Sequence, residues 1–146
     1  LKKEFPSTIW EFVLSSRAVY SKFFYSSKDI AVVKENLKKL DLWEIKDKSI
    51  SSLSIGQRQR VLLCRCLCVS EKIIFLDEPT NSLDINVRKM LYDILEKLNK
   101  EGLTIVMISH DEEAFKYSNR ALVLGKENRV IENVLEKYEK GEINFD

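Results

Sequence analysis

Several features that would mark other classes of protein are scarce in this 146-residue sequence. It has 24 lysines and arginines against 23 aspartates and glutamates, so there is neither a basic field for nucleic acid nor an acidic tail. Only two prolines and four glycines occur, with no low-complexity tract. No apolar run approaches the roughly 20 residues of a membrane-spanning helix. The remaining composition, 45% hydrophobic and 32% charged, is typical of one soluble globular domain.

Metal-ligand patterns are scarce as well. Cys64, Cys66 and Cys68 fall within one predicted helix, where positions 64 and 68 share a face and 66 points elsewhere. A structural metal site needs paired ligands in a loop, usually with histidine nearby. We therefore expect packed free thiols, which fit a reducing cytosol.

The first half of the chain is predicted to be helical. Thr8 and Glu11 stand at capping-box spacing in an apolar helix over residues 8–15. A second helix is expected to begin at Asp29, and a third to run from near residue 54 to about 69. Three- and four-residue spacing predicts an inward face of the second helix formed by Ile30, Val33, Leu37 and Leu40.

The second half alternates strands and helices. Strands are expected at residues 72–76, 103–108, 120–124 and 129–131, and helices at 86–100, 111–117 and 132–140. The first two strands are continuous apolar runs, which predicts burial on both faces of a parallel sheet built by right-handed crossovers. Ligands bind such sheets at the carboxyl ends of the strands.

Polar groups follow the first two strands. The acidic pair Asp77-Glu78 comes directly after the first, and His110, the only histidine, follows the second. Adjacent carboxylates there are costly unless something binds them, such as a hydrated magnesium ion at Asp77. Glu78 would orient or deprotonate a water attacking a phosphate, to which His110 would donate a hydrogen bond. The alternatives are carboxylates that cap the next segment and a structural histidine.

A third group opens the helix that begins near residue 54. Ser54, Gly56 and Gln57 form a turn whose free backbone N–H groups and positive dipole end suit an anion. Taken alone, this turn is an ordinary helix N-cap.

The order and content of these segments resemble ATP-binding-cassette (ABC) ATPases over essentially the whole chain. Residues 53–60 (LSIGQRQR) are similar to the family's signature, and residues 73–80 (IIFLDEPT) to its Walker B strand with the catalytic glutamate. Residues 81–84 (NSLD) resemble the D-loop, and residues 109–111 (SHD) the switch histidine. The resemblance implies that Asp77 holds magnesium through water, that Glu78 is the general base and that His110 contacts the γ-phosphate of ATP.

The same resemblance implies a head-to-tail dimer of two ATPase subunits. Ser54, Gly56 and Gln57 would contact ATP bound to the opposite subunit, and Asp84 would couple the two sites. Ile55 stands where the family usually has glycine. Because a β-branched residue resists positive φ, the contact of this turn with ATP is expected to be weaker.

The phosphate-binding loop is missing. It requires Gly-x-x-x-x-Gly-Lys-Ser/Thr, yet around Gly125-Lys126, the one Gly-Lys pair, Arg120 and Glu127 occupy the positions of the first glycine and the hydroxyl. The chain, which starts at Leu1, is therefore expected to be the C-terminal part of an ATPase subunit. We expect it to be unable to hydrolyse ATP alone and to self-associate through apolar surface left bare.

The expected fold class is α/β, a partial P-loop NTPase (RecA-like) parallel sheet with helices, preceded by an all-helical ABC subdomain. Residues 1–70 would form the helical subdomain ending in the signature helix, and residues 71–146 the C-terminal half of the ATPase core. By resemblance, the helical subdomain touches a transmembrane permease subunit, which places the protein at the cytoplasmic face of the membrane.

Residues 4–17, 22–24 and 61–63 look most like ATPases of zinc- and manganese-type metal importers. Importers of iron chelates and cobalamin have related sequences here. A chromosome or DNA-repair ATPase would place a coiled coil or zinc insertion before the signature, and neither pattern appears. A truncated, non-catalytic docking module is the remaining alternative.

Overall fold

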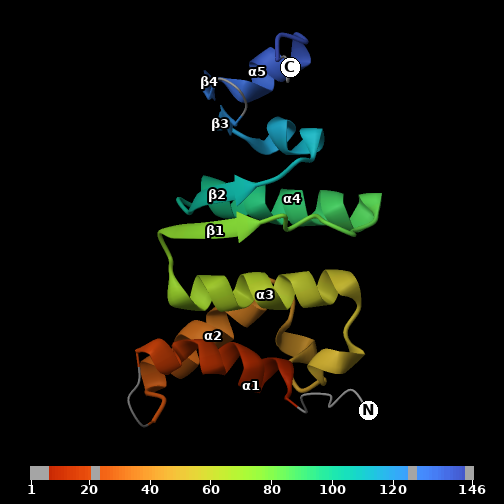
Figure 1. The fold of residues 1–146 in the computed structure, drawn as a ribbon. Coiled ribbons are helices and arrows are strands. Elements are labelled where there is room, and N and C mark those ends of the chain that lie inside the picture. The colour runs from red at the N-terminus through yellow and green to blue at the C-terminus, as the bar shows by residue number, and fades with distance from the viewer. Residues whose placement is uncertain (1–6, 21–23, 125–127, 144–146) are drawn as a thin grey trace. The chain divides into compact units, whose positions relative to one another are not determined.

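The computed structural model describes residues 7–20, 24–124 and 128–143 (Figure 1). The chain forms two compact units, Leu1–Met107 and Ile108–Asp146. As predicted, helices fill the chain up to about residue 70, and strands and helices alternate after it. No helix within the described ranges is long and apolar enough to cross a membrane.

Three of the helices in the first unit begin at capping boxes. The helical elements up to residue 69 are α1 (Ile9–Leu14), the 3-10 helices η1 (Ser15–Val19), η2 (Trp43–Ile45) and η3 (Ile50–Ser52), and the helices α2 (Ser27–Lys39) and α3 (Ile55–Val69). Thr8 and Glu11 cap α1 as their spacing predicts. The predicted start of α2 at Asp29 is wrong, because Ser26 is the N-cap and Asp29 is the third residue of the helix, where its side chain completes the capping box.

The helical core forms where α1 and α2 pack against α3. Val33 and Leu37 of α2 are fully buried, and so is Cys64 of α3. Ile30 is 44% exposed, so its predicted inward position is wrong: it lies at the margin of the apolar stripe. Cys68 is also buried, which confirms that positions 64 and 68 pack on one face of the helix as free thiols. The hydrogen bond to Cys68 and burial raise the pKa of the Cys64 thiol.

An ion pair inside the helical region fastens the end of α3. Arg17 Nε donates to Asp29 Oδ1 at 2.8 Å, and Arg17 Nη1 donates to the carbonyl of Cys68 in the last turn of α3. The hydroxyl and backbone N–H of Ser26, followed by Arg17, lower the pKa of Asp29 to about 2. The guanidinium lies 4.4 Å from the ring centre of Tyr20, whose hydroxyl donates to the next carbonyl, that of Val69. Side chains of η1 and its C-cap therefore bind the last carbonyl groups of α3.

The remaining part of the first unit is a strand–helix–strand segment. It contains β1 (Ile73–Asp77), α4 (Ile85–Lys100) and β2 (Thr104–Ile108). The two strands are neighbours in one sheet and run in the same direction, which confirms the predicted parallel pairing (Figure 1). Gly102, at φ +101°, follows the end of α4, where a left-handed residue is common and glycine adopts that conformation without strain.

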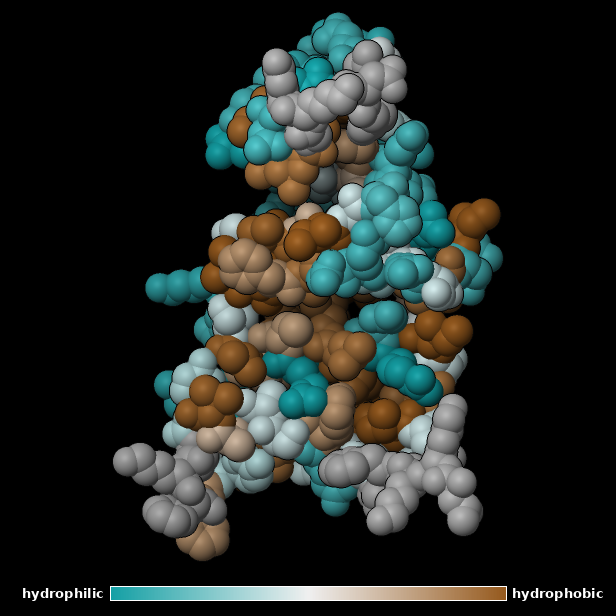
Figure 2. Space-filling model, viewed as in Figure 1, coloured by the Kyte–Doolittle hydropathy of each residue, from teal (hydrophilic) through white to brown (hydrophobic). Residues whose placement is uncertain are grey.

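This sheet is buried on one face only, and the prediction of strands buried on both faces is wrong. Along β1, Ile74 is 4% exposed, whereas its neighbours Ile73 and Phe75 are 40% and 71% exposed. Val106 of β2 is 42% exposed. Successive side chains of a strand point to opposite faces, so α4 covers one row and the other is bare. Hydrophobic residues gather over β1 and β2 on the face seen in Figure 2.

The second unit contains an antiparallel hairpin instead of further parallel strands. After the 3-10 helix η4 (Glu112–Tyr117) come β3 (Arg120–Val123), β4 (Arg129–Glu132) and α5 (Val134–Glu139). Arg120 pairs with Glu132 and Val123 with Arg129, in a sheet separate from β1 and β2. The connection between β3 and β4 is too short for the dozen or more residues that a parallel crossover needs, which explains the hairpin.

Candidate functional site

The signature turn is built as a helix N-cap. Ser54 Oγ accepts the backbone N–H of Gln57 at 3.2 Å, and Gln57 Oε1 accepts the N–H of Ser54 at 3.1 Å. Both side chains that were predicted to contact ATP thus cap α3 in this structure. Ser54 is exposed and Ile55 is 59% exposed, so the turn presents its backbone beside a bulky aliphatic group.

Gly56 has a packing role that the sequence did not reveal. A Cβ atom at this position would lie 3.0 Å from Val87 Cγ1 and 3.4 Å from Met90 Cε of α4. The absence of a side chain therefore lets the first turns of α3 and α4 approach each other closely. Because α4 begins directly after the D-loop, this contact places two predicted functional segments side by side. The sequence gives no indication that Val87 lies against Gly56, because Val87 is only one of the apolar residues on the inward face of its helix.

The acidic pair lies at the carboxyl end of β1, as predicted. Asp77 is the last residue of the strand and is exposed, and Glu78 is half-buried with φ +47°. A positive φ is uncommon for a residue with a side chain and marks a backbone held by its surroundings. The carbonyl of Glu78 accepts the N–H of Asn81, which closes the turn that leads to α4. The turn fixes the direction in which the Glu78 side chain leaves the strand.

Asp84 of the D-loop is the N-cap of α4. Its Oδ1 accepts the backbone N–H groups of Asn86 and Val87, both at 3.0 Å. Upstream, Thr80 is 3% exposed and its carbonyl accepts the N–H of Leu83. The capping alternative was raised for the acidic pair Asp77-Glu78, but the carboxylate that caps α4 is that of Asp84.

His110 belongs to the second unit and follows β2 by two residues. It is exposed, and its neighbour Ser109 accepts the N–H of Asp111 at 3.0 Å. Asp111 in turn caps η4. The predicted adjacency of the two strands that lead to the acidic pair and to His110 is confirmed. The meeting of these side chains around one phosphate remains a prediction.

The described residues suit only part of a magnesium–nucleotide site. Magnesium keeps several waters and takes one or two carboxylates together with phosphate oxygens, a role that the single exposed carboxylate of Asp77 can fill. Within the described ranges, no cluster of three or more histidine, cysteine or acidic side chains is placed to hold a metal ion. The phosphate oxygens would need a cradle of backbone N–H groups and a lysine, which this sequence does not contain.

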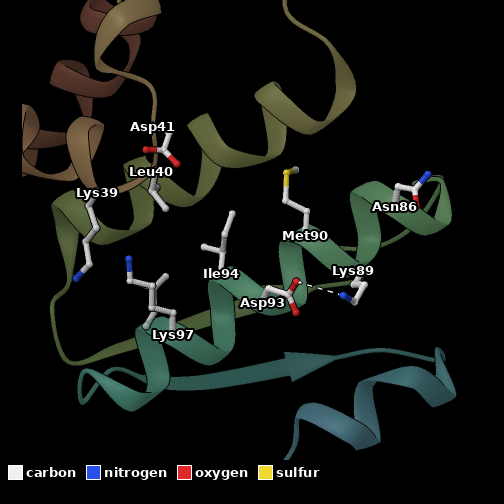
Figure 3. Close-up of a pocket in the computed structure, with 10 residues that line it drawn as sticks. Lys39, Leu40, Asp41, Asn86, Lys89, Met90, Asp93, Ile94 and Lys97 are labelled. Atoms are coloured by element: carbon white, nitrogen blue, oxygen red, sulfur yellow. Dashed lines mark ion pairs between the residues drawn. The ribbon is translucent and has the colours of Figure 1, made fainter.

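A groove between the end of α2 and α4 was not foreseen from the sequence. It encloses about 500 Å³, and Met90 and Ile94 of α4 point into it (Figure 3). Lys39 and Lys97 stand at its rim together with the Lys89–Asp93 pair. None of the residues predicted to bind ATP or magnesium lines this groove. The groove and the predicted site are therefore different places on the chain.

The fold and the order of the motifs fit part of an α/β domain of the P-loop NTPase type. Residues 3–81 match the ABC transporter family. That match spans more than half of the chain, and the protein therefore belongs to the ABC transporter family.

Two curated relatives carry metal-transport names. The chain is 44% identical over 109 residues to a probable metal transport system ATP-binding protein of Chlamydia muridarum, covering 73% of this chain and 46% of that protein. It is 34% identical over 111 residues to a high-affinity zinc uptake system ATP-binding protein of Bacillus subtilis, covering 74% and 48%. The chain thus spans about half the length of these relatives.

A solved structure has the same fold. It is a metal-chelate type ABC transporter in an inward-facing conformation, with a TM-score of 0.81 and 27% identity. The alignment covers 91% of this chain and 56% of that chain. The α/β fold expected of a partial ABC ATPase is therefore confirmed.

Proposed function

We propose that the chain is the C-terminal part of the ATP-binding and ATP-hydrolysing subunit of an ABC transporter that imports a metal ion of the zinc or manganese type. The family match supports an ATPase subunit of a transporter, and the names of the relatives support a metal cargo. The observation that carries the proposal is the acidic pair Asp77-Glu78 at the end of β1, beside the strand that leads to His110.

Each residue near the strand ends has a defined task in this proposal. Asp77 would hold Mg²⁺ through water, and the ion would supply positive charge next to the phosphates. Glu78, aimed by its left-handed backbone, deprotonates the attacking water. His110 donates a hydrogen bond to the γ-phosphate.

The signature and the D-loop act across a dimer in this proposal. Ser54, Gly56 and Gln57 contact the ATP of a second subunit arranged head to tail, and Asp84 couples the two sites. The first half of the chain docks on a transmembrane permease subunit at the cytoplasmic face of the membrane. Nucleic acid has no part, given the net charge of +1.

We further propose that the chain does not hydrolyse ATP alone. Catalysis of phosphoryl transfer depends on positioning, and Glu78 cannot act on a phosphate that nothing cradles. The purified chain should show no turnover, and light scattering should show self-association through its bare apolar surface. ATP turnover by the purified chain that disappears in Glu78→Gln would contradict the predicted lack of activity. A clean monomer at high concentration would contradict the predicted self-association.

The likeness to a metal-chelate transporter supports a second cargo class, an iron chelate or cobalamin. A truncated, non-catalytic docking module is the other alternative. It predicts that the acidic pair is dispensable for uptake, whereas both transporter assignments require it.

Metal uptake by the source cells tests the proposal. The permease partner is first isolated by pull-down with a tagged copy of the chain. Uptake of Zn²⁺ and Mn²⁺ is then measured in cells whose chromosomal gene carries Glu78→Gln. We expect a loss of at least about a hundredfold, the usual contribution of a general base. Glu71→Gln, an exposed glutamate just before β1, is the matched control and should retain uptake. Loss of iron-chelate or cobalamin uptake alone would move the assignment to the second cargo class.

A further inference from the structure

Two buried thiols lie against each other in α3. Cys64 and Cys68 stand one helical turn apart and are 0% and 1% exposed. Their side chains are hydrogen-bonded to each other, and neither thiol forms a disulfide. None of the residues assigned to ATP or magnesium belongs to this pair. The proposed function therefore leaves two buried, chemically reactive groups without a role.

The surroundings of Cys68 favour its deprotonated form. The hydrogen bond from the Cys64 thiol is the main cause that lowers the pKa of Cys68, and it acts against the effect of burial. The guanidinium of Arg17, followed by hydrogen bonds from the side chains of Asn36 and Ser16, lowers this pKa further. Arg17 is itself fixed at this place, because its Nη1 donates to the carbonyl of Cys68. A neighbouring cation and hydrogen-bond donors stabilise a thiolate, which is the form of cysteine that binds metals.

The spacing of the two thiols suits one metal ion. Side chains four residues apart on a helix have Cβ atoms about 5–6 Å apart, and zinc-binding helices with two histidines use the same spacing. Two metal–sulfur bonds of about 2.3 Å can join such neighbouring sulfur atoms through one ion. The described residues offer no group of three or more histidine, cysteine or acidic side chains, as a tetrahedral zinc site would need. The ion that fits is therefore a soft one that accepts two thiolates, such as Cu(I).

We propose that Cys64 and Cys68 bind one soft, monovalent metal ion of the Cu(I) class in the core of the helical region. Binding breaks two S–H bonds, releases both protons to solvent and forms two metal–sulfur bonds, without electron transfer. The product carries a net negative charge, which the Arg17 guanidinium offsets. Because both sulfur atoms are buried, the ion enters when the helical region opens locally. The site shares no residue with the proposed nucleotide site and does not depend on it.

Transfer of Cu(I) from a coloured chelator tests the proposal. The reduced 146-residue chain is added, without oxygen, to the Cu(I) complex of bathocuproine disulfonate, and the loss of colour measures the metal that the chain takes up. We expect one Cu(I) for each chain. Loss of an outer-shell partner of a ligand already costs about 10–100-fold in metal affinity, so Cys64→Ala and Cys68→Ala should each bind more than about a hundredfold more weakly.

Cys66→Ala is the matched control, because Cys66 belongs to the same helix, is half-buried and points away from the pair. It should bind Cu(I) as tightly as the parent chain. Loss of binding in Cys66→Ala, or unchanged affinity in Cys64→Ala, would overturn the proposal. One Cu(I) shared by two chains would overturn it as well, since the ion would then join thiols of separate copies.

Unfolding by urea gives a second readout that needs no variant. An ion that binds the folded chain more tightly than the unfolded chain stabilises it, so Cu(I) should raise the urea midpoint of the parent chain. The midpoint of Cys66→Ala should rise equally, and that of Cys64→Ala should not change. An unchanged midpoint for the parent chain would show that the folded core provides no site, and this outcome counts against the proposal even where an alanine variant does not fold.

Discussion

The helical region and the strand–helix–strand segment of the first unit differ in how they treat apolar surface. In the helical region α1, α2 and α3 enclose one another, and Val33 and Leu37 are completely buried. In the segment that follows, α4 covers one side of β1 and β2, and Phe75 stands in water on the other. The first region encloses its apolar residues, whereas the second leaves one face of its sheet exposed among the described residues.

The two regions also differ in where their polar groups are used. Arg17 and Asp29 pair inside the helical region and hold helix ends together. Asp77 is exposed and Glu78 half-buried at the carboxyl end of β1. The carboxylates proposed to be functional therefore lie at the end of a sheet with one exposed face, and the paired Asp29 lies within the helical core.

Truncating one side chain in each region should lower the free energy of unfolding by very different amounts. Leu37→Ala leaves a cavity in a fully buried site and should lower the free energy of unfolding by about 2–5 kcal/mol. Phe75→Ala removes a mostly exposed ring and should change it by less than about 0.5 kcal/mol. Urea unfolding followed by circular dichroism measures both. Equal losses for the two variants would mean that the sheet face is already covered in solution.

Enlarging Gly56 tests the junction between the two regions. Gly56→Ala places a methyl group 3.0 Å from Val87 Cγ1, which should destabilise the chain by about 1–3 kcal/mol through overpacking. Val87→Ala added to Gly56→Ala should restore part of the loss, because the smaller side chain makes room. The unfolding free energies of the four proteins form a double-mutant cycle. Strict additivity would show that the close approach of α3 and α4 does not persist in solution.

Removing a cap tests the open end of the strand segment. Asp84→Ala leaves two N–H groups at the start of α4 without their acceptor and should cost about 0.5–2 kcal/mol. Asp84→Asn should lose less, since asparagine is an equally good cap. Thermal unfolding of the three proteins gives the ranking. If both variants lose the same stability, the charge of Asp84 rather than its capping geometry matters.

The sequence predicted most elements because local signals and packing agree there. The capping residues Thr8, Ser54 and Asp84 each accept N–H groups of the helix that follows them, and the parallel pairing of β1 with β2 follows from an apolar strand, a helix and a second strand. The prediction that both sheet faces are buried was wrong. An apolar sequence indicates that a strand can be buried, but it does not show whether another element packs on each of its faces. Phe75 reads as a core residue in the sequence and is exposed in the structure.

The sequence singled out the candidate site residues, but it did not predict the packing contacts around them. Gly56 belongs to a recognisable motif, yet nothing in its pattern indicates that Val87 lies against it. Likewise, Arg17 and Asp29 are twelve residues apart and belong to no periodic pattern, so their pairing depends on how η1 and α2 fold together. Long-range contacts of this kind follow from tertiary packing and are not specified by local spacing.

In the helical region, the dependence of stability on pH is expected to centre on Asp29. Its pKa falls from 3.8 to about 2 in the folded chain, mainly because the Ser26 hydroxyl and N–H and then Arg17 bond to the charged form. A depressed pKa means that the folded state binds the proton less readily than the unfolded state. The resulting stabilisation is fully present above about pH 4 and is lost as the pH falls from about 4 toward 2.

Urea midpoints measured across this acid range should therefore fall more steeply for the parent chain than for Asp29→Asn, which has no charge to lose. Asp47→Asn is the matched control, because Asp47 is an exposed aspartate paired only with the adjacent Lys46, and it should follow the parent profile. The two variants should differ from each other in slope between pH 4 and 2 and show parallel profiles above that range. Identical slopes for the parent and Asp29→Asn would show that the folded chain does not stabilise the charged Asp29 carboxylate through Ser26 and Arg17 in solution.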